Sequence, residues 1–252
     1  MISSPWDRRI TRAEKLAAAH PSAAEILKFY AEIARFQKNV SAKLATVEVS
    51  VLDTTLLAPH FNPLLSLVKK IGPPPLAEAA TELLARSDAL QALLIGWRDS
   101  QAGAEPYAFF RSTLLQPYME SAASRSEIPR GTTPPTCPFC SEKPVVGVLR
   151  EEGDGGKRLL ICSLCSTEWE FRRVVCPGCG EESKDKLPVY TAGEFDYVRV
   201  EACDTCNSYI KTVDLTRNGL AVPVVDELAT IPLNLWADER GYKKIQCNLL
   251  GM

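Results

Sequence analysis

Apolar residues in the first half of the chain recur every three or four positions, which is the period of an α-helix. The clearest stripe consists of Ile26, Phe29, Tyr30, Ile33, Phe36, Val40 and Leu44. This spacing predicts a long helix whose apolar face lies in the core. Ser22, followed three residues later by Glu25, predicts that the helix begins with a capping box.

Further helices are predicted on both sides of this stripe, and prolines separate several of them. They cover residues 12–19, 51–58, 63–71, 76–97 and 106–123. His20 precedes Pro21, and a residue before proline avoids the helical region, so the first of these helices should end there. Residues 124–135 are rich in Ser, Arg, Thr and Pro and indicate a linker after an all-helical region of residues 1–130.

After the linker the apolar residues form short runs that are typical of β-strands. Strand-like runs cover residues 145–149, 158–161, 187–190, 195–200 and 209–213, and residues 168–175 suit a half-exposed strand. Glycine-containing turns lie between the first two runs and between the next two, which predicts two hairpins. The tail at residues 226–240 suits a helix that Pro232 starts or kinks, that packs through Leu228, Ile231, Leu235 and Trp236, and that Gly241 ends.

Eight of the nine cysteines fall into four C-x-x-C pairs within this second region. The pairs are Cys137 with Cys140, Cys162 with Cys165, Cys176 with Cys179, and Cys203 with Cys206. Two thiolates at this spacing converge on one tetrahedral cation, so four pairs predict two sites with four sulfur ligands each. Gaps of 21, 10 and 23 residues separate the pairs.

The gap lengths indicate how the pairs are grouped. A gap of about 20 residues suits a hairpin that returns both ends to one metal. We therefore expect the first two pairs to share one site and the last two to share another, with the 10-residue gap as a connector. An interleaved cross-brace is the alternative arrangement. The expected fold is α+β, with a helical domain at 1–130 and tandem zinc-ribbon or rubredoxin-like modules at 131–173 and 174–252, the second carrying the C-terminal helix.

Other uses of paired cysteines fit the sequence less well. A disulfide scaffold would follow a signal peptide, and none is expected here because Arg8 and Arg9 are followed by polar and charged residues. Thioredoxin-like pairs usually come singly beside a βαβ pattern, which is absent. Four sulfur ligands favour zinc, iron or an iron–sulfur cluster, and they leave no open position for a substrate. Cys247 stands alone and is expected to be a small packed side chain.

Composition and charge narrow the function classes. No apolar run reaches the roughly 20 residues that a membrane span needs, so membrane insertion is not expected. Residues 131–252 carry 14 basic and 18 acidic residues, which argues against a nucleic-acid partner. The only histidines are His20 and His60, and no nucleophile–base pair or phosphate loop is present, so no catalytic residue is expected and the chain is not expected to be an enzyme. Thiolate sites without a signal peptide predict the cytoplasm.

The whole chain resembles the formate dehydrogenase accessory protein FdhE family. The resemblance lies in the four C-x-x-C pairs and in three further stretches, residues 12–16, 25–37 and 226–251. It implies two rubredoxin-like modules that bind iron through the eight paired cysteines, with zinc as the alternative metal. It also implies a cytoplasmic maturation factor whose partner is the catalytic subunit of respiratory formate dehydrogenase, which it helps to activate before export.

Two features depart from the family pattern. Ser141 follows the first pair where glycine is favoured, and the helical half is shorter than usual. Two other functions are open: an electron carrier whose iron sites change redox state, and a zinc ribbon that binds nucleic acid. The sequence is silent on oligomeric state.

Overall fold

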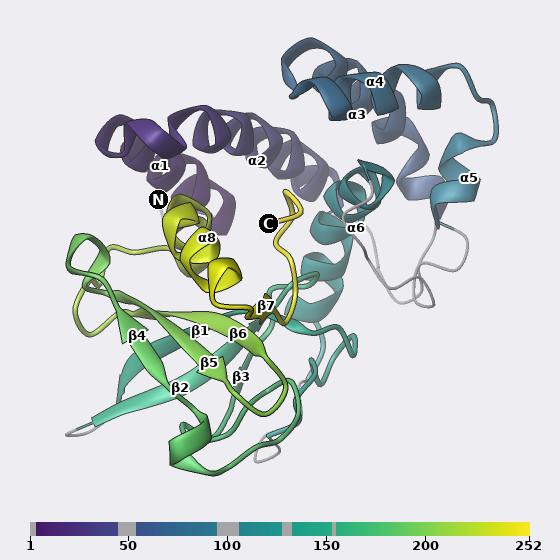
Figure 1. Ribbon diagram of the computed structural model, residues 1–252. Coiled ribbons are helices and arrows are strands. Elements are labelled where there is room, and N and C mark those ends of the chain that lie inside the picture. The colour runs from purple at the N-terminus through teal and green to yellow at the C-terminus, as the bar shows by residue number, and fades with distance from the viewer. Residues whose placement is uncertain (1–3, 45–53, 95–105, 128–132, 153–154) are drawn as a thin grey trace.

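The computed structural model describes residues 4–44, 54–94, 106–127, 133–152 and 155–252. Figure 1 shows an N-terminal helical half on one side of a curled β-sheet, with a C-terminal helical pair between them. The helices are α1 (Pro5–Ala19), α2 (Ala24–Leu44), α3 (Ala58–Ile71), α4 (Pro74–Leu84), α5 (Ala89–Leu94), α6 (Pro106–Ser124), α7 (Pro223–Ala229) and α8 (Ile231–Glu239). Short 3₁₀ turns cover Pro21–Ala23, Thr54–Leu56, Lys184–Lys186 and Gly193–Phe195. The α+β class expected from the sequence is confirmed.

The capping box lies at a different helix from the one predicted. Ser4 accepts a hydrogen bond from the backbone N–H of Asp7 at 3.1 Å, and the Asp7 carboxylate accepts one from Ser4 N at 3.3 Å, so α1 carries the box. The prediction for Ser22 was wrong, because the 3₁₀ turn beginning at Pro21 places Ser22 inside a helical turn instead of before one. Proline at the first position favours such an early start.

Two other helix boundaries differ from the prediction. Helix α3 begins at Ala58 and continues through Pro63, where a start was predicted. The predicted helix over residues 76–97 is divided into α4 and α5 by a turn that contains Ser87 and Asp88. Serine and aspartate compete for backbone hydrogen bonds and favour helix ends, which explains the break. Residues 51–53 and 95–97 of the predicted helices lie outside the described residues.

The strands form a single sheet made of two three-stranded meanders. The strands are β1 (Pro144–Glu152), β2 (Gly155–Cys162), β3 (Glu168–Glu170), β4 (Val189–Thr191), β5 (Val198–Cys203), β6 (Ser208–Asp214) and β7 (Lys243–Lys244). Their order is β3-β2-β1-β6-β5-β4, and β7 pairs with β6. All neighbours within a meander are antiparallel, whereas β1 and β6 are parallel and join the two modules. The predicted tandem modules therefore share one sheet.

A glycine permits this junction. Gly147 of β1 lies opposite Thr212 of β6, and a Cβ atom at Gly147 would lie 2.4 Å from Thr212 Oγ1. Any side chain at position 147 would therefore collide with the neighbouring strand, since packed interiors have no space for added atoms. The close approach of β1 and β6 thus depends on the absence of a side chain.

Curling of the sheet brings distant strands together. Arg158 of β2 donates a hydrogen bond from Nη2 to Glu201 Oε2 of β5 at 2.6 Å. Two other strands lie between β2 and β5, so the backbones would be about 14 Å apart in a flat sheet. The sheet is curled, as Figure 1 shows, and the curl brings β2 and β5 close enough for this contact. The ion pair between Arg158 and Glu201 therefore bridges the two modules.

The C-terminal region connects the sheet to the helices. Val225 and Leu228 of α7 are buried against Leu16 of α1 and Leu27 of α2. The predicted tail helix is two helices, because Thr230 ends α7 and Pro232 lies in the first turn of α8. Leu235 was expected to pack but is 63% exposed. Gly241 has φ +80°, as a left-handed helix terminator requires.

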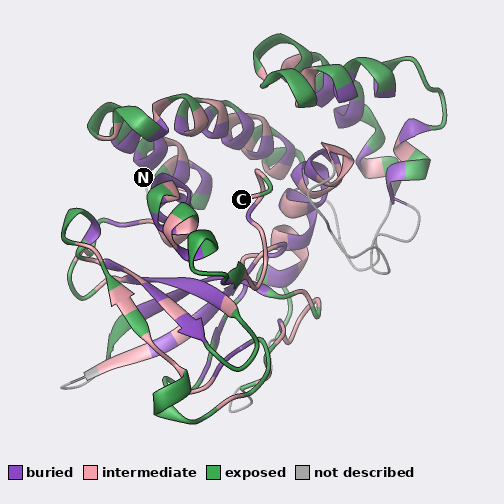
Figure 2. Cartoon of the chain, in the orientation of Figure 1, coloured by how far each residue is buried: buried purple, intermediate pink, exposed green. Residues whose placement is uncertain are grey.

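Burial follows this arrangement of layers. In Figure 2 the strands β1, β5 and β6 are mostly buried, whereas the outer faces of α3 and α4 are exposed. In the predicted strand at 168–175 only Glu168–Glu170 is extended, and Trp169 points inward between two exposed glutamates. No helix among the described residues has both the length and the apolar character needed to cross a membrane.

Candidate metal centres

Each meander carries its cysteines at equivalent positions. One C-x-x-C turn precedes the first strand of the meander, and the other forms the turn between its second and third strands. In the first meander these turns are residues 137–140 and 162–165, and in the second they are 176–179 and 203–206. The sheet therefore brings the ends of each hairpin back together, as the gap lengths indicate.

The backbone closes three of these turns with the same hydrogen bond. Cys137 N donates to Glu142 O at 2.8 Å, and Cys176 N donates to Glu181 O at 2.9 Å. Cys162 N donates to Thr167 O at 3.0 Å in the equivalent position. This repeated closure five residues after the first cysteine directs both thiols of a pair to the same side of the turn.

The residue after each pair adopts a left-handed conformation. Ser141, Ser166 and Asn207 have φ of +68°, +54° and +51°, and Gly180 has φ +80°. Only glycine enters this region without cost, and asparagine does so more readily than serine. The first meander thus holds two serines in a conformation that the second meander gives to glycine and asparagine.

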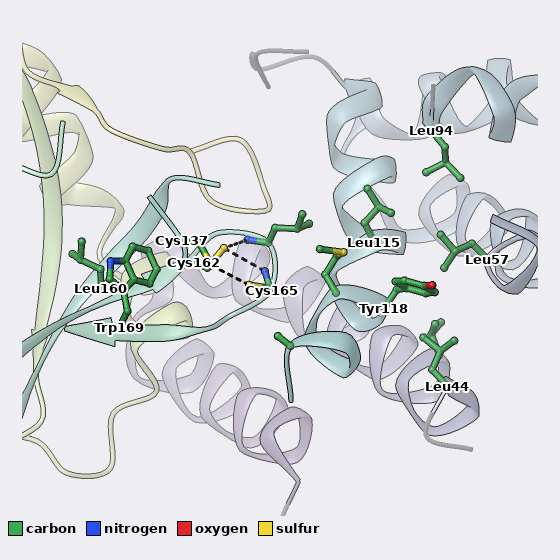
Figure 3. Close-up of a cluster of buried hydrophobic side chains, with 14 of the residues drawn as sticks. Leu44, Leu57, Leu94, Leu115, Tyr118, Cys137, Leu160, Cys162, Cys165 and Trp169 are labelled. Atoms are coloured by element: carbon green, nitrogen blue, oxygen red, sulfur yellow. Dashed lines mark hydrogen bonds between the residues drawn. The ribbon is translucent and has the colours of Figure 1, made fainter. Parts of the chain in front are cut away.

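The four sulfur atoms of the first centre lie deep in the protein. The Sγ atom of Cys140 is 3.3 Å from Cys162 Sγ and 3.5 Å from Cys165 Sγ, and Cys137 Sγ is 3.5 Å from Cys165 Sγ. Cys137, Cys162 and Cys165 are buried and Cys140 is half-buried. Figure 3 shows Cys137, Cys162 and Cys165 beside Trp169 and Leu160, and their hydrophobic cluster extends to Leu115 and Tyr118 of the helical half.

Backbone N–H groups point at a sulfur of the first centre. The N–H groups of Leu164 and Cys165 lie 3.4 and 3.5 Å from Cys162 Sγ. Such donors disperse the negative charge of coordinated thiolates and orient the ligands. The Cys165 thiol itself donates to Thr167 Oγ1 at 3.1 Å.

The second centre has the same composition but reaches the surface. Cys176 Sγ is 3.7 Å from Cys206 Sγ, and Cys179 Sγ is 3.6 Å from Cys203 Sγ. Cys176 and Cys203 are buried, whereas Cys179 and Cys206 are exposed. Gly178 N lies 3.3 Å from Cys176 Sγ, and Ser208 Oγ lies 2.8 Å from Cys206 Sγ.

The sulfur geometry fits a tetrahedral metal ion. In each set the four Sγ atoms all lie within 4.8 Å of one another. A tetrahedral ion with bonds of about 2.3 Å to sulfur separates its ligands by about 3.8 Å, close to the contacts above, whereas a disulfide bond needs about 2.0 Å. All nine cysteines are free thiols. Both sets could therefore hold one metal ion each.

The protonation state of the cysteine thiols depends on whether a cation is bound to them. Burial raises the pKa of the Cys176 thiol to about 12, so the neutral thiol is the favoured form at physiological pH. A metal ion bound to sulfur reverses this preference, because coordination stabilises the thiolate. A tetrahedral ion bound by either set would have all four positions filled by sulfur, which is the arrangement typical of structural metal sites.

Cys247 lies apart from both centres. It is half-buried and lines a cavity of about 310 Å³ together with Arg111 of α6 and Glu142 of the first cysteine turn. Among the described residues it belongs to neither sulfur set. Burial raises the pKa of Glu142 in the same cavity.

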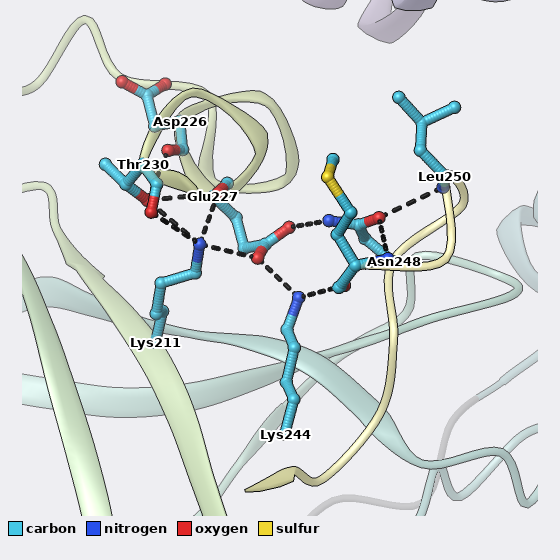
Figure 4. A network of polar contacts seen from close by, with 8 residues as sticks. Lys211, Asp226, Glu227, Thr230, Lys244, Asn248 and Leu250 are labelled. Carbon is cyan, nitrogen blue, oxygen red and sulfur yellow. Dashed lines mark hydrogen bonds and ion pairs between the residues drawn. The ribbon is translucent and has the colours of Figure 1, made fainter. Parts of the chain in front are cut away.

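A buried ionic network beside the sheet was not predicted from the sequence. Lys211 of β6 and Glu227 of α7 are fully buried and form an ion pair at 2.8 Å. Lys244 binds the same carboxylate at 2.5 Å, and Asn248 donates to its other oxygen at 2.8 Å. Figure 4 shows how Glu227 lies between the two ammonium groups and the C-terminal segment.

The network is held in its charged form by its own members. Burial alone would raise the pKa of Glu227, but the ammonium groups of Lys211 and Lys244 outweigh it and lower that pKa to about 2. Burial lowers the pKa of Lys211 to about 8, although the Glu227 carboxylate opposes the shift. Lys211 Nζ also donates to Glu227 O at 2.6 Å and to Thr230 Oγ1 at 3.1 Å, so its charge is well solvated by the protein.

A second buried pair links the first helix to the same region. Arg12 of α1 forms an ion pair with Asp226 of α7 in which Arg12 Nε lies 3.0 Å from Oδ2. Tyr197 donates to Asp226 Oδ1 at 2.8 Å. Arg12, Asp226, Glu227, Lys244 and Asn248 all lie in the stretches on which the family resemblance rests. In the sequence, the one sign of this network is that these polar residues cluster in the stretches that resemble the family.

The fold and the two sites together define a class of protein. Its members have a helical domain joined to a double meander that carries two sets of four cysteines, each suited to a metal ion. Comparisons with known proteins match this description. The family described as "FdhE, central domain" matches residues 136–173, and that described as "FdhE, C-terminal domain" matches residues 174–250.

Relatives align over almost the whole chain. A protein named "Protein FdhE homolog" from Aquifex aeolicus is 28% identical, with 96% of this chain and 94% of the relative covered. The protein of the same name from Edwardsiella ictaluri is 30% identical, with 96% and 87% covered. The crystal structure of the FdhE protein from Pseudomonas aeruginosa superposes with a TM-score of 0.74 at 25% identity, covering 97% of this chain and 95% of that one. The chain belongs to the FdhE family.

Proposed function

We propose that this protein is a maturation factor that binds the catalytic subunit of formate dehydrogenase in the cytoplasm and supports its activation before export. The proposal is supported by one observation above all. The chain aligns with FdhE homologues over nearly its full length and carries two complete sets of four cysteines on one sheet.

In this proposal the protein acts by binding and not by catalysis. The two sulfur sets are closed sites, which suits a structural role for their metal ions. The His20 ring is tilted by 40° against that of Phe195, with centroids 5.4 Å apart, and burial lowers the pKa of His60. These surroundings suit packing roles.

We propose iron as the metal of both centres, with zinc as the alternative. Cys137, Cys140, Cys162 and Cys165 would hold the first ion, and Cys176, Cys179, Cys203 and Cys206 the second. Either ion accepts four thiolates in a tetrahedral arrangement. The bound ion would supply folding free energy by tying together the two C-x-x-C turns of each meander.

Co-purification tests the proposed partner. The catalytic subunit of formate dehydrogenase from the same organism is tagged and expressed with this protein, and the retained protein is measured by immunoblotting. The proposal predicts retention of the wild-type protein and a lower amount of a Cys176→Ala/Cys203→Ala variant, whose second ribbon lacks two ligands. An unrelated tagged iron–sulfur protein serves as the control bait. Equal recovery on both baits, or none on either, would contradict the proposal.

A further inference from the structure

A cavity of about 160 Å³ lies between the two modules, next to the second sulfur set. Cys176 and Cys203 form part of its wall. Four basic side chains and one acidic side chain line it. The basic residues are Arg158 of β2, Arg173 of the connector, Lys184 of the 3₁₀ turn and Arg199 of β5, and the acidic residue is Glu201 of β5.

The single carboxylate is already used on both oxygens. Glu201 Oε2 accepts from Arg158 Nη2 at 2.6 Å, and Oε1 accepts from Arg199 Nε at 2.8 Å and from Nη2 at 2.6 Å. Both oxygens of this one carboxylate are thus occupied by Arg158 and Arg199, and a single carboxylate matches the charge of only one of the four cations.

One of the arginines keeps a donor without an acceptor. Arg158 is 2% exposed, and its Nη1 donates to Arg172 O at 2.9 Å. Its Nε is buried and has no hydrogen-bond partner. A buried charged donor without an acceptor is costly, so an acceptor at this place would be strongly favoured.

Two further cations face the same space without a partner. Among the described residues, neither Arg173 nor Lys184 forms an ion pair or a side-chain hydrogen bond. The nearby thiolates would offset part of this positive charge, but they do not bring an acceptor to Arg158 Nε. The remaining walls include Val175 and Leu187, which are half-buried, and Val189, which is 54% exposed, so the side of the cavity that carries Arg173 and Lys184 is open to solvent.

From these contacts we propose that the cavity binds one small oxyanion group, such as a carboxylate or a sulfate-like ion, through Arg158, Arg173 and Lys184. The volume lies below the roughly 300 Å³ at which ligand pockets usually begin, so it suits a single group and not a large molecule. The group is either a free anion or the tip of an acidic side chain from another protein. The proposal is independent of the formate dehydrogenase partner.

Titration of the full-length, metal-loaded protein tests the site. Sodium sulfate is added at constant ionic strength against sodium chloride, and the ¹⁵N–¹H resonance of Arg158 Nε is followed by NMR. We expect saturable binding that the Arg173→Ala/Lys184→Ala variant weakens by about tenfold or more, because two charge-assisted contacts are lost. The Lys69→Ala/Lys70→Ala variant removes the same charge from exposed positions of α3 and should bind sulfate like the wild type.

Two further titrations identify the source of the group. Sodium acetate represents a free anion, and a blocked Gly-Glu-Gly peptide represents an acidic side chain. Similar affinities support a free anion, and tighter binding of the peptide supports a partner's side chain. The proposal is overturned if Arg158 Nε shows no saturable shift with any of the three probes. It is also overturned if both double variants bind sulfate equally well while metal analysis shows both to be fully loaded.

Discussion

The residue that follows each C-x-x-C pair determines how closely the backbone can wrap around its sulfurs. Ser141 and Ser166 occupy left-handed conformations in the first module, and Gly180 and Asn207 take the equivalent places in the second. The conformation costs a residue with a Cβ about 1–2 kcal/mol. The turns keep it nevertheless, because the hydrogen bonds that close them and the convergence of the sulfurs both require it.

We therefore expect Ser141→Gly to stabilise the protein by about 0.5–1 kcal/mol, since relief of the left-handed strain exceeds the added freedom of the unfolded chain. Urea denaturation of the metal-loaded protein measures the effect. Ser121→Gly, inside α6, is the matched control and should destabilise by about 0.5 kcal/mol. A destabilised Ser141→Gly variant would show that the serine hydroxyl matters more than the backbone strain.

Much at this scale could be read from the sequence. Spacing alone indicated which cysteines come together, and Ser141 was recognised as a departure from glycine. The orphan Nε of Arg158 could not be foreseen, because its surroundings come from strands that are not neighbours in the sheet. The same holds for Lys211, which lies in a strand whose other residues suggest an ordinary buried strand without an ion pair.

Helix α7 connects the helical half of the molecule to the sheet. Asp226 binds Arg12 of α1 on one side, and Glu227 binds Lys211 of β6 and Lys244 of β7 on the other. Two successive acidic residues thus connect the first helix, the sheet and the C-terminal segment. Removing one partner of a buried ion pair leaves an uncompensated charge and costs about 3–5 kcal/mol.

Glu227→Gln should therefore destabilise the protein by about 3–5 kcal/mol at neutral pH, because it leaves two buried ammonium groups without their carboxylate. Urea denaturation at pH 7 measures this change. Glu182→Gln removes an exposed partner of Arg172 and should change stability little. Equal effects of the two variants would contradict the assigned role of the network.

The Glu227 carboxylate also makes the stability of the protein depend on pH. The folded pKa of Glu227 is about 2, below its ordinary value of 4.5, so the unfolded chain binds the proton more readily. Its contribution is therefore complete above pH 4.5 and is lost as the pH falls towards 2. The stability difference between wild type and Glu227→Gln should shrink over that range, and a constant difference would count against the network.

The junction of the meanders was less predictable than the meanders themselves. Hairpins follow from short apolar runs and the turn-forming glycines between them, which are local signals. The parallel pairing of β1 with β6 joins segments about 65 residues apart along the chain, and it depends on the missing side chain of Gly147 against Thr212. A lone glycine in a strand has several structural explanations, so this one could not be selected from sequence.

Across the whole molecule the two sulfur sets differ in their surroundings and not in their chemistry. The first set belongs to a hydrophobic cluster shared with α2, α5 and α6, so it lies between the helical half and the sheet. The second set exposes Cys179 and Cys206. The modules are repeats in topology, but only the first is enclosed by the rest of the protein.

Chelator treatment should therefore remove the metal of the second centre first. Exposed sulfurs give a chelator direct access, whereas release from the first centre requires local opening of the core. Metal release is followed with a chromogenic chelator and compared between wild type and a Cys179→Ala variant. We expect two kinetic phases in the wild type and loss of the fast phase in the variant. A single phase, or loss of the slow phase, would contradict the assignment.

The most direct test of the account is the metal content of the purified chain together with its visible spectrum. Protein prepared without added metal should contain two ions per chain. A Cys137→Ala/Cys162→Ala variant and a Cys176→Ala/Cys203→Ala variant should each retain one. Iron would give thiolate charge-transfer bands, and zinc a colourless solution. Absence of metal from the wild-type chain, or equal loading of all three proteins, would contradict the two cysteine centres on which the account is built.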